Sequence, residues 1–352
     1  MAIYSVWNNK GGVGKSYLTF QIAAEYAKTH RDHSVLVIDL CPQANASSML
    51  LGGIVSGEQK LVEIASAARP LTIAGYIEER ILSPYQNPRV GGRFAVKVAQ
   101  HNAAIPDNLY LVVGDESLEI QASRVSRATT PGPADAWRLV HSWISNLIAD
   151  IRHSWNVPDS AVFIDCNPSF TVYTELAMSA SDNLIIPFSA DGSSKRAVRA
   201  VLALLYGITR VAGAPQSEFF LNCQAFRMSP PKIYSYVGNR LTQMNLGAAS
   251  AFKTVVDEVG REIWAVWRAN PNQFSIHPSG QPVPRTQAEF RKMFQVEIND
   301  ANTASVVSGA LGIPITSLSA GMHNIAGKRS QVNQSQLDKQ KPNMRRFVQT
   351  IE

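Results

Sequence analysis

The chain has 352 residues, of which 45% are hydrophobic and 17% charged, and its formal net charge is +6. This is an ordinary globular composition rather than a disordered one, and the length suits one large α/β domain with insertions or two modest domains. No run approaches the roughly 18–20 apolar residues that span a bilayer. The excess of Lys and Arg permits binding to nucleic acid or to an anionic membrane surface.

The three cysteines are Cys41, Cys166 and Cys223, and they are far apart in the chain. Their odd number and wide spacing predict neither a disulfide framework nor a zinc site. The first apolar segment, Ala2–Trp7, has no basic stretch or cleavage site typical of a secretory signal. We therefore expect a reduced, cytoplasmic protein.

The N-terminal region predicts a strand, a glycine-rich turn, a helix and a second strand. Ala2–Trp7 is apolar, Ser16–Lys28 has helical spacing of apolar residues, and Ser34–Leu40 is a β-branched run ending near a carboxylate. This order is a βαβ unit, so the two strands should be parallel and the crossover right-handed.

Later segments continue this alternation. The expected strands are 161–165, 183–187 and 218–223, and the expected helices are 171–180, 193–206 and 231–244. Apolar strands that alternate with amphipathic helices predict an α/β fold with a doubly wound, mostly parallel sheet. Residues 52–108 should form a helical or irregular insertion. We expect residues 1–326 to be the nucleotide-binding domain, with C-terminal helices, and residues 327–352 to be a basic tail or helix.

Residues 10–16 read Lys-Gly-Gly-Val-Gly-Lys-Ser and predict a phosphate-binding loop. In such a loop backbone N–H groups surround the phosphates, the second lysine reaches the β and γ oxygens, and the hydroxyl coordinates Mg²⁺. We expect ATP and Mg²⁺ as cofactors. The predicted contacts to the nucleotide come from one continuous segment: Lys10, Gly11, Gly12, Val13, Gly14, Lys15, Ser16 and Tyr17.

Lys10 departs from the general phosphate-loop pattern, because nucleotide binding needs only one lysine. We interpret Lys10 as a group that stabilises charge on the leaving phosphoryl, in the same subunit or across a dimer interface.

These motifs resemble the deviant Walker A ATPases of the ParA/MinD type, and most of all the ParA-like partition proteins. The resemblance rests on residues 10–16, on Val-Ile-Asp-Leu-Cys-Pro-Gln-Ala-Asn at 37–45 and on Val-Phe-Ile-Asp-Cys-Asn-Pro-Ser at 162–169, and continues more weakly through 183–187 and 303–314. It implies a P-loop NTPase fold and an ATP-driven homodimer in which Lys10 touches the partner's nucleotide.

The resemblance also implies roles for individual residues. Lys10, Lys15 and Asp39 would be catalytic, and Ser16, Asp39 and Asp165 would lie at Mg²⁺. Its further implications are non-specific DNA binding, association with the nucleoid, and a ParB-like or cargo adaptor that stimulates hydrolysis.

One position departs from the family pattern Asp-Leu-Asp-Pro-Gln. The second aspartate, which the family uses to orient the attacking water, is Cys41 here. A neutral thiol is a poor acceptor for a water proton. Cys41 therefore predicts weak hydrolysis, and an alternative is a nucleotide-gated interaction protein that scarcely hydrolyses ATP.

The sequence leaves open which partner the basic residues bind. Candidate DNA contacts are exposed cations near the predicted 231–244 helix and in the tail: Arg227, Lys232, Arg240, Arg345 and Arg346. A MinD-like membrane helix at 343–352 is the alternative, with Met344, Phe347, Val348 and Ile351 as its apolar face. An amide-forming ligase is a third class, but no acid-binding pocket is identifiable. Iron–sulfur carriers are disfavoured, because the chain has no CxxC pair.

Overall fold

The structure is a computed structural model that describes residues 2–130, 132–155, 159–189, 191–209, 211, 213–241 and 246–352, without the side chains of 240, 241 and 246–252. One sheet carries eight strands in the order β3-β4-β2-β5-β1-β6-β7-β8. β3 pairs antiparallel with β4, and the other neighbours pair in parallel. The predicted doubly wound fold is confirmed.

The strands of this sheet are β1 (Ile3–Val6), β2 (Ser34–Asp39), β3 (Val96–Lys97), β4 (Leu109–Val112), β5 (Ser160–Asp165), β6 (Asn183–Phe188), β7 (Lys232–Leu241) and β8 (Gln295–Asn299). The first helices are α1 (Lys15–Thr29), α2 (Asn45–Leu51), α3 (Gly53–Ala65), α4 (Ile73–Leu82), α5 (Leu118–Ala128), α6 (Ala136–His141) and α7 (Trp143–Trp155). The later helices are α8 (Val172–Ala180), α9 (Ser194–Tyr206), α10 (Glu218–Ala225), α11 (Leu246–Ala269), α12 (Gln287–Phe294), α13 (Thr303–Leu311) and α14 (Gln334–Val348). Short 3₁₀ turns are η1 (Gly91–Phe94), η2 (Val98–Gln100) and η3 (Pro271–Gln273), and a separate hairpin joins β9 (Gly321–Ile325) to β10 (Lys328–Val332).

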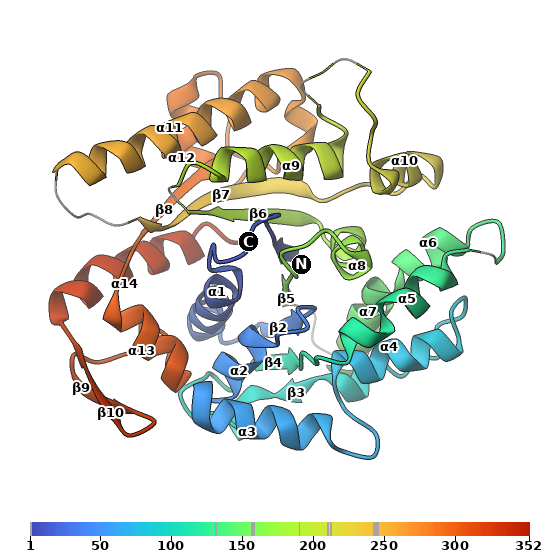
Figure 1. Cartoon of the computed structure of the whole chain (residues 1–352), viewed down its shortest axis with the longest axis horizontal. Coiled ribbons are helices and arrows are strands. Elements are labelled where there is room, and N and C mark those ends of the chain that lie inside the picture. The colour runs from blue at the N-terminus through green and yellow to red at the C-terminus, as the bar shows by residue number, and fades with distance from the viewer. Residues whose placement is uncertain are drawn as a thin grey trace.

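Two hydrophobic cores cover the two faces of the sheet. Side chains alternate along β2, so Leu36 and Ile38 enter one core while Val35 and Val37 enter the other. Figure 1 shows α9 and α11 over one face of β6 and β7, and α1 and α14 on the opposite side. Burial of both faces explains the continuous apolar character of the central strands.

Two predicted elements are wrong. The predicted strand at 218–223 is helix α10, in which Ser217 accepts a hydrogen bond from the backbone of Phe220 and only one side of the segment is buried. A short apolar run does not distinguish a buried strand from a helix by its pattern. The predicted helix at 231–244 is strand β7 at 232–241, which pairs with both β6 and β8, and 242–245 lie outside the described residues.

Residues 52–108 contain α3, α4 and the edge strand β3, so this segment extends the sheet as well as covering it. Residues 327–352 contain β10 and α14. The apolar side of α14 faces inward, because Met344, Phe347 and Val348 are each at most 2% exposed. Within the described residues, no helix combines the length and the apolar character needed to cross a membrane.

The packing of α14 predicts a large stability difference between two neighbouring positions. Phe347→Ala should lower the free energy of unfolding by about 3–5 kcal/mol, because it removes a buried ring and leaves a cavity. Arg346→Ala, at the exposed position beside it, should change that free energy by less than about 0.5 kcal/mol. Urea unfolding followed by circular dichroism measures both, and equal effects would show that α14 does not pack as described.

Candidate functional site

The predicted phosphate-binding loop joins β1 to α1 at the carboxyl edge of the parallel strands. Gly12 and Gly14 have φ of 75° and 79°, a backbone region that favours glycine over residues with a Cβ. Gly14 immediately precedes α1, whose first N–H groups have no partner inside the helix. The loop therefore presents backbone donors and the positive end of a helix to an anion.

Lys15 lies in the first turn of α1 and folds back over the loop. Its Nζ donates to the carbonyl oxygen of Lys10 at 2.7 Å and approaches that of Asn8 at 3.4 Å. The side chain is buried, and this burial lowers the pKa of Lys15 despite the nearby carboxylate of Asp165. Lys15 is thus a positive charge held inside the loop, where a phosphate would lie against it.

Lys10 points to a different part of the chain. Its Nζ donates to Ser189 Oγ at 3.1 Å and forms an ion pair with Asp191, both in the loop after β6. Partial burial raises the pKa of Asp191, but hydrogen bonds from Lys10, Ser189 and Ser193 outweigh it and hold that pKa well below its usual range. The Lys10 side chain remains 23% exposed, so its ammonium lies at the surface of the loop.

Asp39 and Asp165 end two adjacent central strands. They are direct partners in the register of β2 and β5, and both are fully buried. Burial raises the pKa of Asp39 to about 6, and burial together with the charge of Asp39 raises the pKa of Asp165 well above its usual range. Asp39 is fixed by Ser47, whose backbone N and Oγ donate at 2.9 and 2.8 Å, and by the backbone N of Cys41 at 3.1 Å.

The residues at this edge fit a Mg²⁺ ion. Asp165 Oδ2 is buried and accepts no hydrogen bond from any described residue, while Oδ1 receives Thr19 Oγ1 at 3.4 Å. Mg²⁺ in nucleotide sites uses one or two carboxylates together with phosphates and water, so it does not need a cluster of protein ligands. Ser16, Asp39 and Asp165 are the residues that would hold it, and the ion would neutralise phosphate charge.

Cys41 lies in the loop after β2 and is buried. Burial, followed by the charge of Asp39, raises the pKa of its thiol to about 12, so the group is neutral at physiological pH. Cys166 is fully buried and its pKa is raised further for the same reason. Both thiols are therefore neutral groups, and neither supplies a negative charge to the site.

A cavity of about 580 Å³ is lined by Lys15, Ser16 and both thiols, whereas Lys10, Asp39 and Asp165 do not line it. Its lining comes from the phosphate loop, the loops after β2 and β5, and helices α2, α3 and α13. The predicted residues on its wall are Gly11, Gly12, Gly14, Lys15, Ser16 and Tyr17, while Val13 is buried beneath the loop. Gln43, Asn45, Ser48, Glu58 and Ser305 add polar side chains that the sequence analysis did not assign.

The predicted DNA contacts do not form one group. Arg227 and Lys232 are exposed at the amino end of β7, whereas Arg240 follows Asn239 near its carboxyl end, and the side chain of Arg240 lies outside the described residues. Arg240 lies eight positions after Lys232 along the strand, which corresponds to roughly 26 Å. Arg345 and Arg346 are exposed on α14, on a different part of the surface.

Several residues that were not predicted from the sequence hold the site in place. Ser47 orients Asp39, Asp191 binds Lys10, and Asn239 Nδ2 donates to the carbonyl of Val13 at 2.9 Å. Asn239 and Asp191 are far from the loop in sequence, so no local pattern could reveal these contacts. Ser47 lies in the first turn of α2, which begins at Asn45, and a short hydroxyl residue near a helix start was an available signal.

A parallel sheet, a glycine-rich turn leading into a helix and paired carboxylates at the strand ends define a P-loop nucleotide-binding protein. A family model described as AAA domain matches residues 1–217, and the chain belongs to that family. It is a P-loop ATPase of the ParA/MinD type.

Known structures share this fold at low sequence identity. An ATP complex of a McdA variant from Cyanothece has a TM-score of 0.57 at 13% identity, covering 100% of this chain and 98% of that one. pNOB8 ParA has a TM-score of 0.50 at 15% identity, covering 84% and 80% of the two chains. An uncharacterized protein of Pseudomonas putida is 26% identical over 231 residues, which are 66% of this chain and 71% of that protein.

The position of Lys15 predicts a specific loss of nucleotide affinity. Lys15→Ala should weaken ATP binding by at least about tenfold, because a hydrogen bond to a charged group contributes about 1.5–3 kcal/mol. Lys28→Ala, which changes an exposed lysine at the other end of α1, should bind ATP normally. Isothermal titration calorimetry with Mg²⁺ and ATP measures both affinities, and unchanged binding by Lys15→Ala would refute the site.

Proposed function

We propose that the chain is an ATP-dependent dimerising switch that positions DNA or another large cargo through non-specific DNA binding. The observation that carries this proposal is that the two loop lysines, Lys10 and Lys15, point in different directions. Lys15 folds into its own loop, whereas Lys10 lies at the loop surface and is paired with Asp191.

This arrangement gives the lysines different tasks. Lys15 can contact phosphates within its own subunit, so Lys10 is available for a nucleotide held by a second copy of the chain. Dimerisation would exchange the Asp191 carboxylate for phosphate oxygens of the partner's ATP, replacing one ion pair by another. The second copy would thereby complete the charge around the reacting phosphoryl group.

The partners follow from the resemblance to partition proteins. They are DNA without sequence preference, reached at the nucleoid, and a ParB-like or cargo adaptor that stimulates hydrolysis. The net charge of +6 is compatible with DNA. A MinD-like membrane helix at 343–352 is disfavoured, because Met344, Phe347, Val348 and Ile351 are all buried in the core. A membrane anchor would need those side chains exposed.

A second candidate is a nucleotide-gated interaction protein with little hydrolysis. The buried neutral thiol of Cys41 favours it, since no carboxylate occupies that position. Asp39 is a candidate alternative base, but hydrogen bonds from Ser47 and Cys41 fix its orientation. Both candidate functions use the same nucleotide site and the same dimer, and they differ in the rate of ATP hydrolysis.

The proposal predicts DNA binding that requires ATP. The full chain with Mg²⁺ and ATP should retain a labelled DNA duplex of arbitrary sequence, and its affinity should fall steeply with salt because phosphate contacts release counterions. Fluorescence anisotropy between about 50 and 200 mM salt measures this dependence. Lys10→Ala should still bind ATP, yet lose both the dimer and ATP-dependent DNA retention. Absence of DNA binding by the unaltered chain at the lowest salt would refute the proposal.

Cys41 supplies a separate prediction about turnover. Cys41→Asp should raise basal ATP hydrolysis by about tenfold or more, because a positioned general base contributes up to about 10²–10⁴-fold. Cys41→Asn is the matched control of similar size without a basic carboxylate and should leave the rate low. Phosphate release at saturating ATP measures the rates. An equal rate for both variants would mean that another group activates the water.

A further inference from the structure

The positive charge of the chain is concentrated near its C-terminus. Residues 327–352 contain six basic residues and two acidic ones, a net charge of +4 out of +6 for the whole chain. The basic residues are Lys328, Arg329, Lys339, Lys341, Arg345 and Arg346, and the acidic ones are Asp338 and Glu352. Glu352 accepts hydrogen bonds from Ser279, so its carboxylate is engaged away from α14.

Helix α14 packs against α1 (Figure 1). This contact brings basic side chains of the two helices near one another. Arg345 Nε lies 3.7 Å from Glu25 Oε1 of α1, and Lys341 Nζ donates to the carbonyl of Leu318 at 2.7 Å. Lys28 Nζ reaches Ser317 Oγ at 3.4 Å. We call Lys28, Arg31, Lys341 and Arg345 the α1–α14 basic face.

These cations are close enough to influence one another. Partial burial, followed by the charges of Arg345 and Lys28, lowers the pKa of Lys341. Arg31 makes no ion pair or hydrogen bond with any described residue, and Lys28 contacts a hydroxyl rather than a carboxylate. The basic face therefore carries positive charge that the chain does not itself neutralise.

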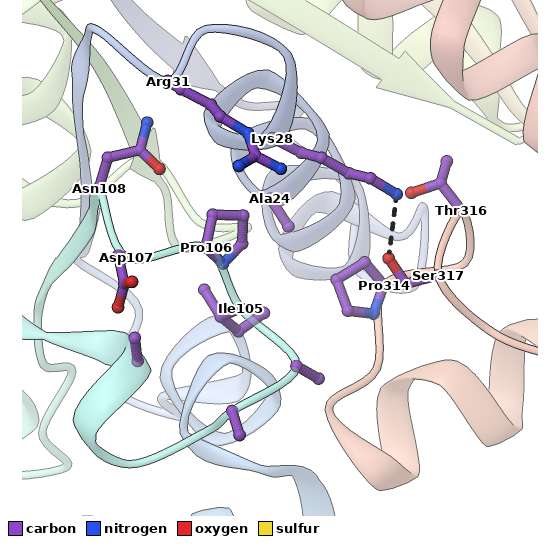
Figure 2. A pocket seen from close by; sticks show the side chains of 13 residues that line it. Ala24, Lys28, Arg31, Ile105, Pro106, Asp107, Asn108, Pro314, Thr316 and Ser317 are labelled. Carbon is purple, nitrogen blue, oxygen red and sulfur yellow. Dashed lines mark hydrogen bonds between the residues drawn. The ribbon is translucent and has the colours of Figure 1, made fainter.

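The face borders a cavity of about 640 Å³ between the end of α1, the turn before β4 and the segment after α13. In Figure 2 the Lys28 side chain extends toward Ser317, and the guanidinium of Arg31 lies over Pro106. The lining of the cavity mixes apolar residues, mostly alanine and proline, with polar ones such as Asp107, Asn108 and Thr316. It includes no aromatic ring on which a base could stack.

The carboxylates around the face are mostly occupied. Glu25 is buried and accepts hydrogen bonding from Thr316 as well as facing Arg345. Asp107, on the opposite lip of the cavity, lies 3.8 Å from Lys97. Asp338 accepts from Gln334 at 2.7 Å, and Asp32 is exposed beside Arg31 in the turn after α1. These groups offset part of the charge at the rim, but neither Lys28 nor Arg31 forms an ion pair with a described carboxylate.

We propose that the α1–α14 basic face, with Lys28 and Arg31 at its centre, binds the phosphate backbone of duplex DNA. This inference rests on the proposed DNA-binding function and assigns it a surface. The lack of aromatic lining favours a duplex over single strands, which bind by base stacking. The burial of the apolar side of α14 favours DNA over a lipid surface, because no bulky side chain is exposed there for insertion.

The position of the face is compatible with dimerisation. α1 begins at the phosphate loop and has 15 residues, so the basic face lies roughly 22 Å from the nucleotide end of the helix. A partner that covers the loop would leave the far end of α1 exposed.

The test compares two doubly substituted chains of equal charge. Lys28→Gln with Arg31→Gln removes two cations from the basic face. Arg261→Gln with Arg268→Gln removes two exposed cations from α11, which covers the other face of the sheet. Binding of the full chain to a labelled 30-base-pair duplex is measured with Mg²⁺ and ATP by anisotropy over a salt series. ATP affinity and melting temperature of each variant establish that the nucleotide site and the fold are intact.

We expect the basic-face variant to lose at least about tenfold in DNA affinity, with a log–log salt slope shallower by about 2, since each lost phosphate contact changes it by about 0.9. The α11 variant should match the unaltered chain. Equal losses in both variants, or a loss confined to the α11 variant, would overturn the assigned surface while leaving DNA binding intact. No DNA binding by the unaltered chain would overturn the proposed function itself. Preferential loss of binding to vesicles rich in phosphatidylglycerol, with DNA binding unchanged, would assign the face to a membrane instead.

Discussion

The two buried carboxylates at the ends of β2 and β5 are the electrostatic constraint on which the site depends. Parallel register places Asp39 directly beside Asp165, and neither side chain reaches solvent. Two such charges are tolerated only when positive charge and hydrogen-bond donors surround them. Lys15, the hydroxyls of Ser16 and Thr19, and the backbone at the start of α2 supply part of that compensation. The negative charge of the two carboxylates that remains uncompensated suits a divalent cation.

Asp39 also links the site to the elements beyond it. Its oxygens hold the first turn of α2 through Ser47, and Ser47 Oγ accepts the backbone N of Gly114 at 2.8 Å after β4. α2 packs against α3, and both helices line the nucleotide cavity. Ser47 therefore connects the charge at Asp39 to α2, which forms part of the wall of the nucleotide cavity. This contact gives the segment between β2 and α3 a structural reason to respond to the nucleotide.

The parts of the molecule that could be predicted are those specified by local sequence. Residues 10–16 define a loop conformation through their glycines, and the apolar runs ending in Asp39 and Asp165 define two buried strands. By contrast, β7 has polar residues within an aromatic and aliphatic run, and only its pairing with β6 and β8 makes it a strand. The contacts of Lys10 with Asp191 and of Arg345 with Glu25 join residues far apart in the chain. The spacing of residues in the sequence cannot predict these contacts, because they depend on the order of the strands in the sheet.

Helix α1 connects the two charged regions of the protein, and its direction matches the charge of each. Its amino end, after Gly14, presents unpaired N–H groups and partial positive charge where phosphate would bind. Its carboxyl end carries partial negative charge, which stabilises Lys28 in the last turn. Reversing the helix would oppose both arrangements. The βαβ crossover therefore fixes the position of both ends of α1. It places the phosphate loop at one edge of the sheet and Lys28 at the opposite edge, where α14 adds its own basic side chains.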